Sequence, residues 1–286
     1  MSAVCVVMRS HNDMPLAAET LRNLRTQRTP FVLVAFDNAS TDGTLEEIRK
    51  YTDRIHHVPA GAYVPGRVLN QAMAATEGEI VVFINSDCTP QNDFMLEALL
   101  AGFISESVAA VFGRQMPRPG CRTLLAKDTE DTYGDGSRQR HWRHCFSMAV
   151  SAIRRSVWER MPFNEDLQYS EDIDWTWRAR GRGYEIRYVP DAIVMHSHNY
   201  TLRQFYKRHF GEGRADARIF EWTPWDKSLV RYSLLPYLRQ VASDWKYCGA
   251  KLQVAEALYS PVLRMAQLTG RRKGFSSAWR KSQNPE

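Results

Sequence analysis

The sequence predicts an α/β protein in which helices flank a Rossmann-like mixed central sheet, followed by a helical C-terminal extension. Three observations support this prediction. The chain of 286 residues is 44% hydrophobic and 24% charged, which suits one large or two small globular domains. In its first half, short apolar runs alternate with longer amphipathic stretches, as in a doubly wound βαβα chain. From Lys227 onward, apolar residues recur at helical intervals, and Pro236 and Pro261 are expected to interrupt them.

We expect three strands and three helices in the first half. They are predicted at residues 3–8 (strand), 16–27 (helix), 31–36 (strand), 44–51 (helix), 70–76 (helix) and 79–84 (strand). Ligands of such folds gather in the crevice outside the carboxyl ends of the strands. The turns that follow residues 31–36 and 79–84 are therefore the first places where a site is expected.

The N-terminal residues, the length of the apolar stretches and the cysteines indicate the cellular compartment of the protein. The N-terminal residues lack a basic stretch followed by a long apolar one, and no window approaches the roughly 18 apolar residues of a membrane span. Five well-separated cysteines form no C-x-x-C pair, so reduced thiols are expected. These features predict a cytoplasmic location.

The formal net charge of +6 is concentrated near the end of the chain, where residues 227–286 hold eleven Lys or Arg against three acidic residues. No helix-turn-helix, zinc-finger or RNA-binding signature accompanies them, so no nucleic-acid partner is expected. The cluster Arg271-Arg272-Lys273 suits a peripheral contact with an anionic membrane surface on the inner face of the plasma membrane. Core packing beside a solvated basic tail explains the same pattern equally well.

The turn after residues 31–36 reads DNASTDGT. Asp37 lies at the strand end, and Thr41 or Asp42 is placed to cap the helix that follows. A carboxylate at this position suits recognition of the base or ribose of a nucleotide. An ordinary turn with a helix cap accounts for the same residues.

The turn after residues 79–84 reads Asn85-Ser86-Asp87-Cys88. Asp87 would lie at the mouth of the sheet. A hard divalent cation such as Mg²⁺ or Mn²⁺ can be held there by one or two carboxylates, with substrate phosphates and water completing its shell. A simple turn, continued by Pro90, is an alternative of equal weight.

An acidic cluster at Glu171, Asp172 and Asp174 begins an expected helix after Ser170. Three carboxylates within four residues can raise the pKa of one of them and prepare it to accept a proton. A competing interpretation is that Ser170 caps the helix and the acids complement its dipole. Both interpretations can hold together.

Residues 113–143 are rich in Gly, Pro, Arg and Asp and have little periodicity, so a mobile loop is expected. A zinc site beside it is disfavoured, because adjacent residues such as His144 and Cys145 seldom both reach one tetrahedral ion, even with His141 nearby. Five basic side chains would give this loop an anion-binding face: Arg138, Arg140, His141, Arg143 and His144.

Five blocks follow one another in the sequence, at residues 37–44, 64–88, 113–119, 146–175 and 188–213. Single motifs of this kind are common by chance, but their order and spacing together are specific. Together they resemble family 2 glycosyltransferases of the GT-A fold, and within them bacterial enzymes of the rhamnosyltransferase type. The resemblance implies a GT-A catalytic domain over residues 1–215, with a nucleotide-sugar half at 1–112 and an acceptor half at 113–215, and a helical basic extension over 216–286.

The resemblance implies a site for a nucleotide-diphosphate sugar, built from the first half of the chain. Asp37 is then the carboxylate that recognises the nucleoside base, and Arg67 is the basic residue near the donor diphosphate. The other expected donor contacts are Arg9, Asn12, Asn38, Ser86 and Asp87.

The resemblance also implies Mn²⁺ or Mg²⁺ as cofactor. Asp87 is similar to the last acid of a D-x-D motif, but Asn85 occupies the first acidic place, so the metal would be held by fewer charges. His196 resembles the histidine that completes such a site. His198 is the close alternative, because residues i and i+2 lie on the same face of an extended chain.

Asp172 is implied as the catalytic base, with Glu171 supporting it electrostatically. Asp172 would remove the acceptor hydroxyl proton while that oxygen attacks the anomeric carbon opposite the leaving diphosphate, so the configuration inverts. Arg114, Asp174 and Trp175 are expected at the acceptor site, with Trp175 as a stacking platform.

The expected function is transfer of a sugar, best represented by L-rhamnose from dTDP-rhamnose, to a hydroxyl of a lipid-linked saccharide in cell-surface polysaccharide synthesis. One alternative is a different hexosyl donor. Another is a nucleotide-sugar-binding protein without catalysis, which the missing first acid of D-x-D makes worth retaining, although Glu171-Asp172 and the paired histidines argue against it. A nucleotidyltransferase is disfavoured, because Arg9-Ser10-His11-Asn12 is a poor version of a Gly-rich phosphate loop.

Overall fold

The computed structural model describes residues 4–139, 145–220 and 233–283, and of residues 281–283 only the backbone. The chain divides into two compact units. Unit 1 comprises Met1–Arg118, Thr129–Asp166 and Glu171–Ser197, and unit 2 comprises Pro119–Asp128, Leu167–Ser170 and His198–Glu286. The domain boundary at residue 215 stays a prediction.

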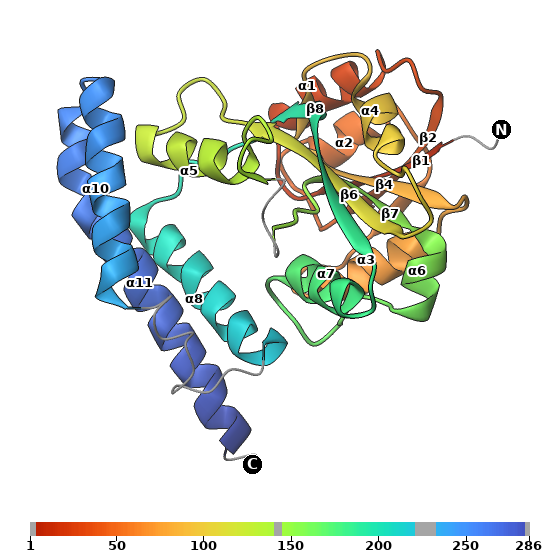
Figure 1. Ribbon diagram of the computed structural model, residues 1–286. Helices are drawn as coiled ribbons and strands as arrows, with labels where there is room; N and C mark the ends of the chain where they lie inside the picture. The colour runs from red at the N-terminus through yellow and green to blue at the C-terminus, as the bar shows by residue number, and fades with distance from the viewer. Residues whose placement is uncertain (1–3, 140–144, 221–232, 284–286) are drawn as a thin grey trace. The chain divides into compact units, whose positions relative to one another are not determined.

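Unit 1 contains one eight-stranded sheet (Figure 1). Its strands are β1 (Val4–Ser10), β2 (Phe31–Asp37), β3 (Ile55–His57), β4 (Ile80–Asn85), β5 (Thr89–Pro90), β6 (Val108–Met116), β7 (Val150–Arg154) and β8 (Glu185–Met195). The strand order is β3-β2-β1-β4-β7-β6-β8-β5. The first four are parallel, β7 runs antiparallel between β4 and β6, β8 is parallel to β6, and β5 is antiparallel to β8. The predicted mixed central sheet is confirmed.

Helices cover both faces of this sheet, because alternate residues of each strand point to opposite sides. Val7 and Phe83 belong to one apolar core, with residues of α3 (Pro65–Ala74) and α7 (Glu171–Gly181). Met8 and Ile84 belong to the other, with residues of α1 (Leu16–Leu24) and α4 (Met95–Ala101). Among its described residues, this unit also contains the helices α2 (Thr44–Ile48) and α6 (Arg155–Arg160), and α5 (Thr123–Tyr133) has residues in both units.

The sequence located the strands well and the helices less well. Helix α3 begins at Pro65, earlier than expected, because proline suits the first helical turn. The expectation of an irregular loop over residues 113–143 is wrong, since β6 continues to Met116 and α5 follows. The adjacent buried residues Leu124 and Leu125 give α5 little helical periodicity.

The basic residues of that segment are only partly described. Arg138 is exposed and its Nη1 lies 2.6 Å from Asp131 Oδ1. The other predicted anion-binding residues lie outside the described residues, and with them the histidines of the disfavoured zinc site: Arg140, His141, Arg143 and His144.

Unit 2 is helical, as predicted for the end of the chain, and contains α8 (Leu202–Ile219), α10 (Leu234–Ala250) and α11 (Val254–Gln283). Helices α8 and α11 approach closely at two glycines: a Cβ on Gly213 would lie 2.2 Å from the Arg271 carbonyl oxygen, and one on Gly274 would lie 2.0 Å from that of Phe210. In the part of the chain that the structure describes, no helix combines the length and apolarity needed to cross a bilayer.

Pro261 does not interrupt the helical extension, contrary to expectation, because α11 runs through it. A proline has no N–H, so the carbonyl four residues earlier loses its usual partner. That carbonyl belongs to Ala257, and it accepts a hydrogen bond from Trp245 Nε1 at 2.9 Å instead. Pro236 lies in the first turn of α10, where proline is tolerated.

Candidate active site

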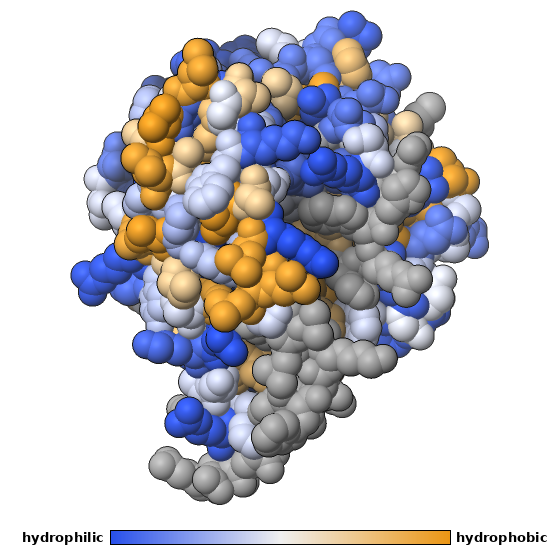
Figure 2. All heavy atoms as spheres, turned by 60° about the vertical axis from the view of Figure 1, so that its left-hand side comes forward, coloured by the Kyte–Doolittle hydropathy of each residue, from blue (hydrophilic) through white to orange (hydrophobic). Residues whose placement is uncertain are grey.

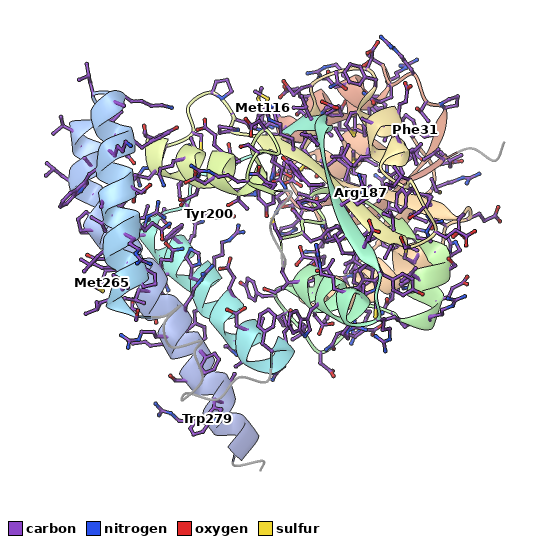
Figure 3. The ribbon with its side chains drawn as sticks, viewed as in Figure 1. Phe31, Met116, Arg187, Tyr200, Met265 and Trp279 are labelled. Atoms are coloured by element: carbon purple, nitrogen blue, oxygen red, sulfur yellow. The ribbon has the colours of Figure 1, made fainter. Side chains whose placement is uncertain are left out.

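The carboxyl ends of three parallel strands meet at one edge of the sheet, as the sequence predicts. The register pairs Ser10 of β1 with Asp37 of β2, and Arg9 of β1 with Asn85 of β4. The end of β6, at Met116, is labelled in Figure 3. Polar residues that follow these strands are therefore the first candidates for a site.

The turns after β1 and β2 are joined by hydrogen bonds between side chains and backbone. Asn12 Oδ1 accepts from the Thr41 N–H at 2.8 Å, and Asp42 Oδ2 accepts from the Met14 N–H at 2.9 Å. Asp42 also accepts from the backbone N–H of Thr44 at the start of α2, but the N-cap position itself is Gly43 and neither Thr41 nor Asp42. Asn12 has a φ of 53°, which asparagine adopts more readily than most residues. Asn38 is held at the end of β1, because its backbone N–H donates to the Ser10 carbonyl oxygen at 2.9 Å.

Two residues expected to contact the donor are buried in this structure, and their role at the donor stays a prediction. Asp37 has no exposed surface, and its carboxylate accepts hydrogen bonds from Ser10 Oγ at 2.9 Å and from Ser40 Oγ at 2.6 Å. Ser86 also has no exposed surface, and its hydroxyl donates to Asp13 Oδ2. Both side chains hold loops in place, because their polar atoms are used within the protein.

Arg9 links β1 to the acidic start of α7. Its Nη2 donates to Asn85 Oδ1 at 2.8 Å and to the Met148 carbonyl oxygen at 3.3 Å. Its Nη1 lies 3.9 Å from Glu171 Oε1, and both side chains are only 11% exposed. The guanidinium therefore places a buried positive charge beside the Glu171-Asp172 pair.

The surroundings of Glu171 and Asp172 favour the neutral form of both carboxyl groups. Burial and then the charge of Asp172 raise the pKa of Glu171 to about 7, against the lowering effect of Arg9. Burial also raises the pKa of Asp172, opposed by hydrogen bonds and by Arg9. Asp172 is partly exposed, whereas Glu171 is buried, so Asp172 is the one that a substrate hydroxyl can approach. A carboxylate of raised pKa is a stronger base.

Asp87 and His196 meet because β5 pairs with the end of β8. His196 Nε2 lies 3.5 Å from Asp87 Oδ2, and Asp87 is 6% exposed. The other ring nitrogen, Nδ1, lies 2.7 Å from Gln115 Oε1. Since that oxygen can only accept, Nδ1 carries a proton, and Nε2 is the ring nitrogen on Asp87's side of the ring.

These side chains fit a divalent cation. Asp87, His196 and His198 each offer one ligand atom, and the three atoms lie within 4.8 Å of one another. An octahedral ion with bonds of about 2.1 Å holds its ligands roughly 3 to 4 Å apart, so only small adjustments are needed. Gln115 would orient the His196 ring, as outer-shell partners of metal-bound histidines do.

The family follows from the sequence match over this half of the chain. The model described as glycosyl transferase family 2 matches residues 5–161. The chain belongs to this family. An O-antigen chain rhamnosyltransferase, WbaN of Salmonella anatum, is 33% identical over 195 residues, which are 64% of this chain and 62% of WbaN. RfbN of Salmonella typhimurium, described in the same words, is 24% identical over 225 residues, 73% of this chain and 71% of RfbN.

Solved glycosyltransferases share the fold and confirm its GT-A class. The mannosyltransferase PcManGT from Pyrobaculum calidifontis, solved with GDP-Man and Mn²⁺, has a TM-score of 0.63 at 19% identity, covering 96% of this chain and 86% of that one. Glucosyl-3-phosphoglycerate synthase from Mycobacterium tuberculosis, solved with Mn²⁺, UDP-glucose and phosphoglyceric acid, has a TM-score of 0.56 at 21% identity, covering 76% and 80%.

Within this family 2 chain, two further predicted site residues have charged partners of their own. Arg67 Nε lies 3.3 Å from Glu165 Oε2, so a donor diphosphate would have to compete with that carboxylate. Buried Asp174 accepts from Arg178 Nε at 2.8 Å, one helical turn later. Arg114 is partly buried on β6; burial raises the pKa of Tyr188, and the charge of Arg114 opposes that rise.

Trp175 is not a stacking platform, and the structure corrects that prediction. Its side chain has no exposed surface, its Nε1 donates to the Met161 carbonyl oxygen at 2.7 Å, and its ring stacks on Phe163 with centroids 5.4 Å apart. An acceptor cannot reach a side chain enclosed on all sides. Trp177, two residues later, is 40% exposed.

Three residues that support the Asp87 region were not among the predicted site residues. Asp13 accepts from Ser86, and Gln115 orients His196. Arg118 Nη2 donates to the Asp87 carbonyl oxygen at 2.8 Å, which fixes the backbone beside the carboxylate. Gln115 and Arg118 lie within the block at residues 113–119, which is the signal that could have found them.

We expect Glu171→Gln to stabilise the protein more at pH 8 than at pH 5. The folded protein favours the neutral carboxyl, so Glu171's contribution to stability is complete below its ordinary pKa of 4.5 and is lost as the pH rises through about 7. Glutamine does not titrate. The difference in free energy of unfolding between variant and wild type should therefore grow by up to about 3 kcal/mol across this range.

Urea unfolding at a series of pH values measures this difference. Glu159→Gln, at an exposed position of α6, is the matched control and should show no such growth. A difference between Glu171→Gln and wild type that stays constant from pH 5 to pH 8 would show that Glu171 is not held neutral.

Proposed function

We propose that this protein is an inverting, metal-dependent glycosyltransferase that moves a sugar from a nucleotide-diphosphate donor to a hydroxyl of a saccharide acceptor. The observation that carries the proposal is the Glu171-Asp172 pair, with a raised Glu171 pKa, beside buried Arg9. Family membership and the Asp87-His196 contact in the same unit support it.

Asp172 serves as the base in this proposal. It accepts the proton of the acceptor hydroxyl while the acceptor oxygen bonds to the anomeric carbon and the bond from that carbon to the diphosphate breaks. The nucleoside diphosphate leaves from the opposite face, so the configuration inverts and no covalent intermediate forms on the protein. Arg9 stabilises the carboxylate form that must be present before the proton is taken.

The cation site favours Mn²⁺ over Mg²⁺. Asp87 is the single carboxylate beside the two imidazoles of His196 and His198, and Asn85 Oδ1 already accepts from Arg9. Mg²⁺ prefers oxygen ligands, whereas imidazole suits transition metals better. Such an ion, when bound, neutralises charge that develops on the leaving diphosphate.

We further propose dTDP-L-rhamnose as donor and a lipid-linked saccharide as acceptor, in cell-surface polysaccharide synthesis. The support is the likeness to WbaN and RfbN, both described as O-antigen chain rhamnosyltransferases. A lipid-linked acceptor requires the enzyme to work against the inner face of the plasma membrane. A different hexosyl donor, or binding without catalysis, remains as the alternative to be tested.

The test is a donor panel. The protein is incubated with dTDP-rhamnose, UDP-glucose, GDP-mannose or UDP-N-acetylglucosamine, each with Mn²⁺, Mg²⁺ or EDTA, and the release of nucleoside diphosphate and the thermal shift are measured. We expect dTDP-rhamnose with Mn²⁺ to give the largest values of both. Turnover of another sugar nucleotide would overturn the donor assignment. A thermal shift without turnover would favour a binding protein without catalysis. The absence of both nucleoside diphosphate release and a thermal shift with every donor would contradict the proposal.

A further inference from the structure

Helices α10 and α11 of unit 2 expose an extensive apolar surface. The exposed apolar residues are spaced by one or two helical turns, apart from the adjacent pair Leu234-Leu235, so on each helix they form one stripe. Leu238 is 57% exposed on α10 and Leu258 is 75% exposed on α11. We call this surface the apolar face, and it consists of Leu234, Leu235, Leu238, Trp245, Leu252, Val254, Leu258, Val262 and Met265.

The apolar face is additional to the side of each helix that packs inside unit 2. On α10 the buried residues are Val241, Asp244 and Cys248, and on α11 they include Leu263 and Leu268. The side of the molecule that carries α10 and α11 comes forward in Figure 2, where hydrophobic side chains form patches between hydrophilic ones. Met265, a member of the apolar face, is labelled in Figure 3.

The two stripes meet through a direct contact. Trp245 Nε1 donates to the carbonyl oxygen of Ala257, next to Leu258, and the Tyr237 hydroxyl donates to the carbonyl oxygen of Pro261, next to Val262. The turn between the helices adds Leu252, which is 87% exposed. A monomeric soluble protein rarely leaves so many neighbouring large apolar side chains in water, so a partner for this surface is expected.

The charges around the apolar face identify that partner. Residues 234–283 contain two acidic residues, Asp244 and Glu256. Asp244 is fully buried against Arg264, and Glu256 Oε1 lies 2.8 Å from Arg122. The exposed charges on α10, α11 and the turn between them are cationic in the described side chains: Arg239, Lys246, Lys251, Arg272, Lys273 and Arg280.

We infer that the apolar face docks on an anionic membrane surface, with α10 and α11 lying in the plane of the interface. Apolar side chains including a tryptophan, flanked by cations, are the features of helices that bind in this way. A second copy of the chain fits less well, because a symmetric contact would bring the same cations together. The inference does not rest on the proposed transfer reaction.

Vesicle flotation tests this inference with the full-length protein. Vesicles of phosphatidylcholine with 30% phosphatidylglycerol should retain the protein at low salt, whereas pure phosphatidylcholine vesicles or high salt should retain much less. Leu238→Gln/Leu258→Gln should abolish most of the retention. Arg239→Glu/Lys246→Glu should weaken it by roughly fivefold or more for each cation removed, because each contributes about 1 kcal/mol near such a surface.

Control variants separate docking on the membrane from loss of the fold and from self-association. Ile104→Gln and Arg49→Glu change an exposed apolar and an exposed basic residue of unit 1, and both should float like wild type. Asp172→Asn should also float, because the vesicles contain neither donor nor acceptor. Circular dichroism checks that each variant is folded. Failure of wild type to bind the anionic vesicles, or equal binding by the Leu238/Leu258 variant, would overturn the inference, as would a wild-type dimer that this variant dissociates.

Discussion

Asp172→Asn is expected to lower kcat for sugar transfer by about 10² to 10⁴ while leaving donor affinity nearly unchanged. Asparagine keeps the shape of the side chain and can still accept the hydrogen bond that the Ile173 N–H donates to Asp172 Oδ1 at 2.8 Å. It cannot take the acceptor proton. The loss should therefore appear in the chemical step and not in donor binding.

The pH profile provides a second readout for the same residue. Burial raises the pKa of both Glu171 and Asp172, so the wild-type rate should rise with pH as the pair loses its proton. The residual rate of Asp172→Asn should lack this rise. Asp191→Asn, at an exposed carboxylate on β8, is the matched control and should transfer like wild type.

Steady-state transfer kinetics and donor titration together measure these effects. A kcat for Asp172→Asn within a few fold of wild type would remove Asp172 as the base. In that case Glu171 would be the next residue to test, because its carboxyl lies beside the same guanidinium.

The sequence predicted the sheet edge because each strand is a short apolar run that ends at a polar turn. The register then brings Arg9, Asp37 and Asn85 to one edge, which follows from the parallel order of β2, β1 and β4. Asp87 and His196 come from distant parts of the chain. Their meeting depends on β5 pairing with β8, a contact that no local pattern could indicate.

Other features could not be read from local patterns. Trp175 follows the acidic cluster directly, but a helix turns each residue by about 100°, so a neighbour in sequence points into the core. The orientation of His196 by Gln115 joins residues 81 positions apart. The continuation of α11 through Pro261 depends on Trp245, which lies on another helix.

Asn85 shows how the structure accommodates a departure from the expected D-x-D motif. Its amide oxygen accepts from Arg9, and because the amide is neutral, the charge of Arg9 remains available to Glu171 3.9 Å away. An aspartate at this position would pair with Arg9 and weaken its influence on the Glu171-Asp172 pair. The missing acid is therefore compatible with the proposed catalysis, and it would leave Asp87 with a larger share of the proposed metal binding.

Asp87→Asn is accordingly expected to weaken Mn²⁺ binding more than about 100-fold and to lower transfer in parallel at a fixed Mn²⁺ concentration. It removes the only carboxylate among Asp87, His196 and His198. Gln115→Leu leaves all three ligands but removes the acceptor for His196 Nδ1, and loss of such an outer-shell partner typically costs about 10- to 100-fold in affinity.

Asp93→Asn, at a carboxylate paired with exposed Arg28, is the matched control and should leave Mn²⁺ affinity unchanged. Titration of Mn²⁺ by electron paramagnetic resonance measures all three variants. A loss of Mn²⁺ affinity that is largest for Asp87→Asn and smaller for Gln115→Leu would support a bound ion held by these residues. Equal Mn²⁺ affinity of Asp87→Asn and wild type would place the metal elsewhere.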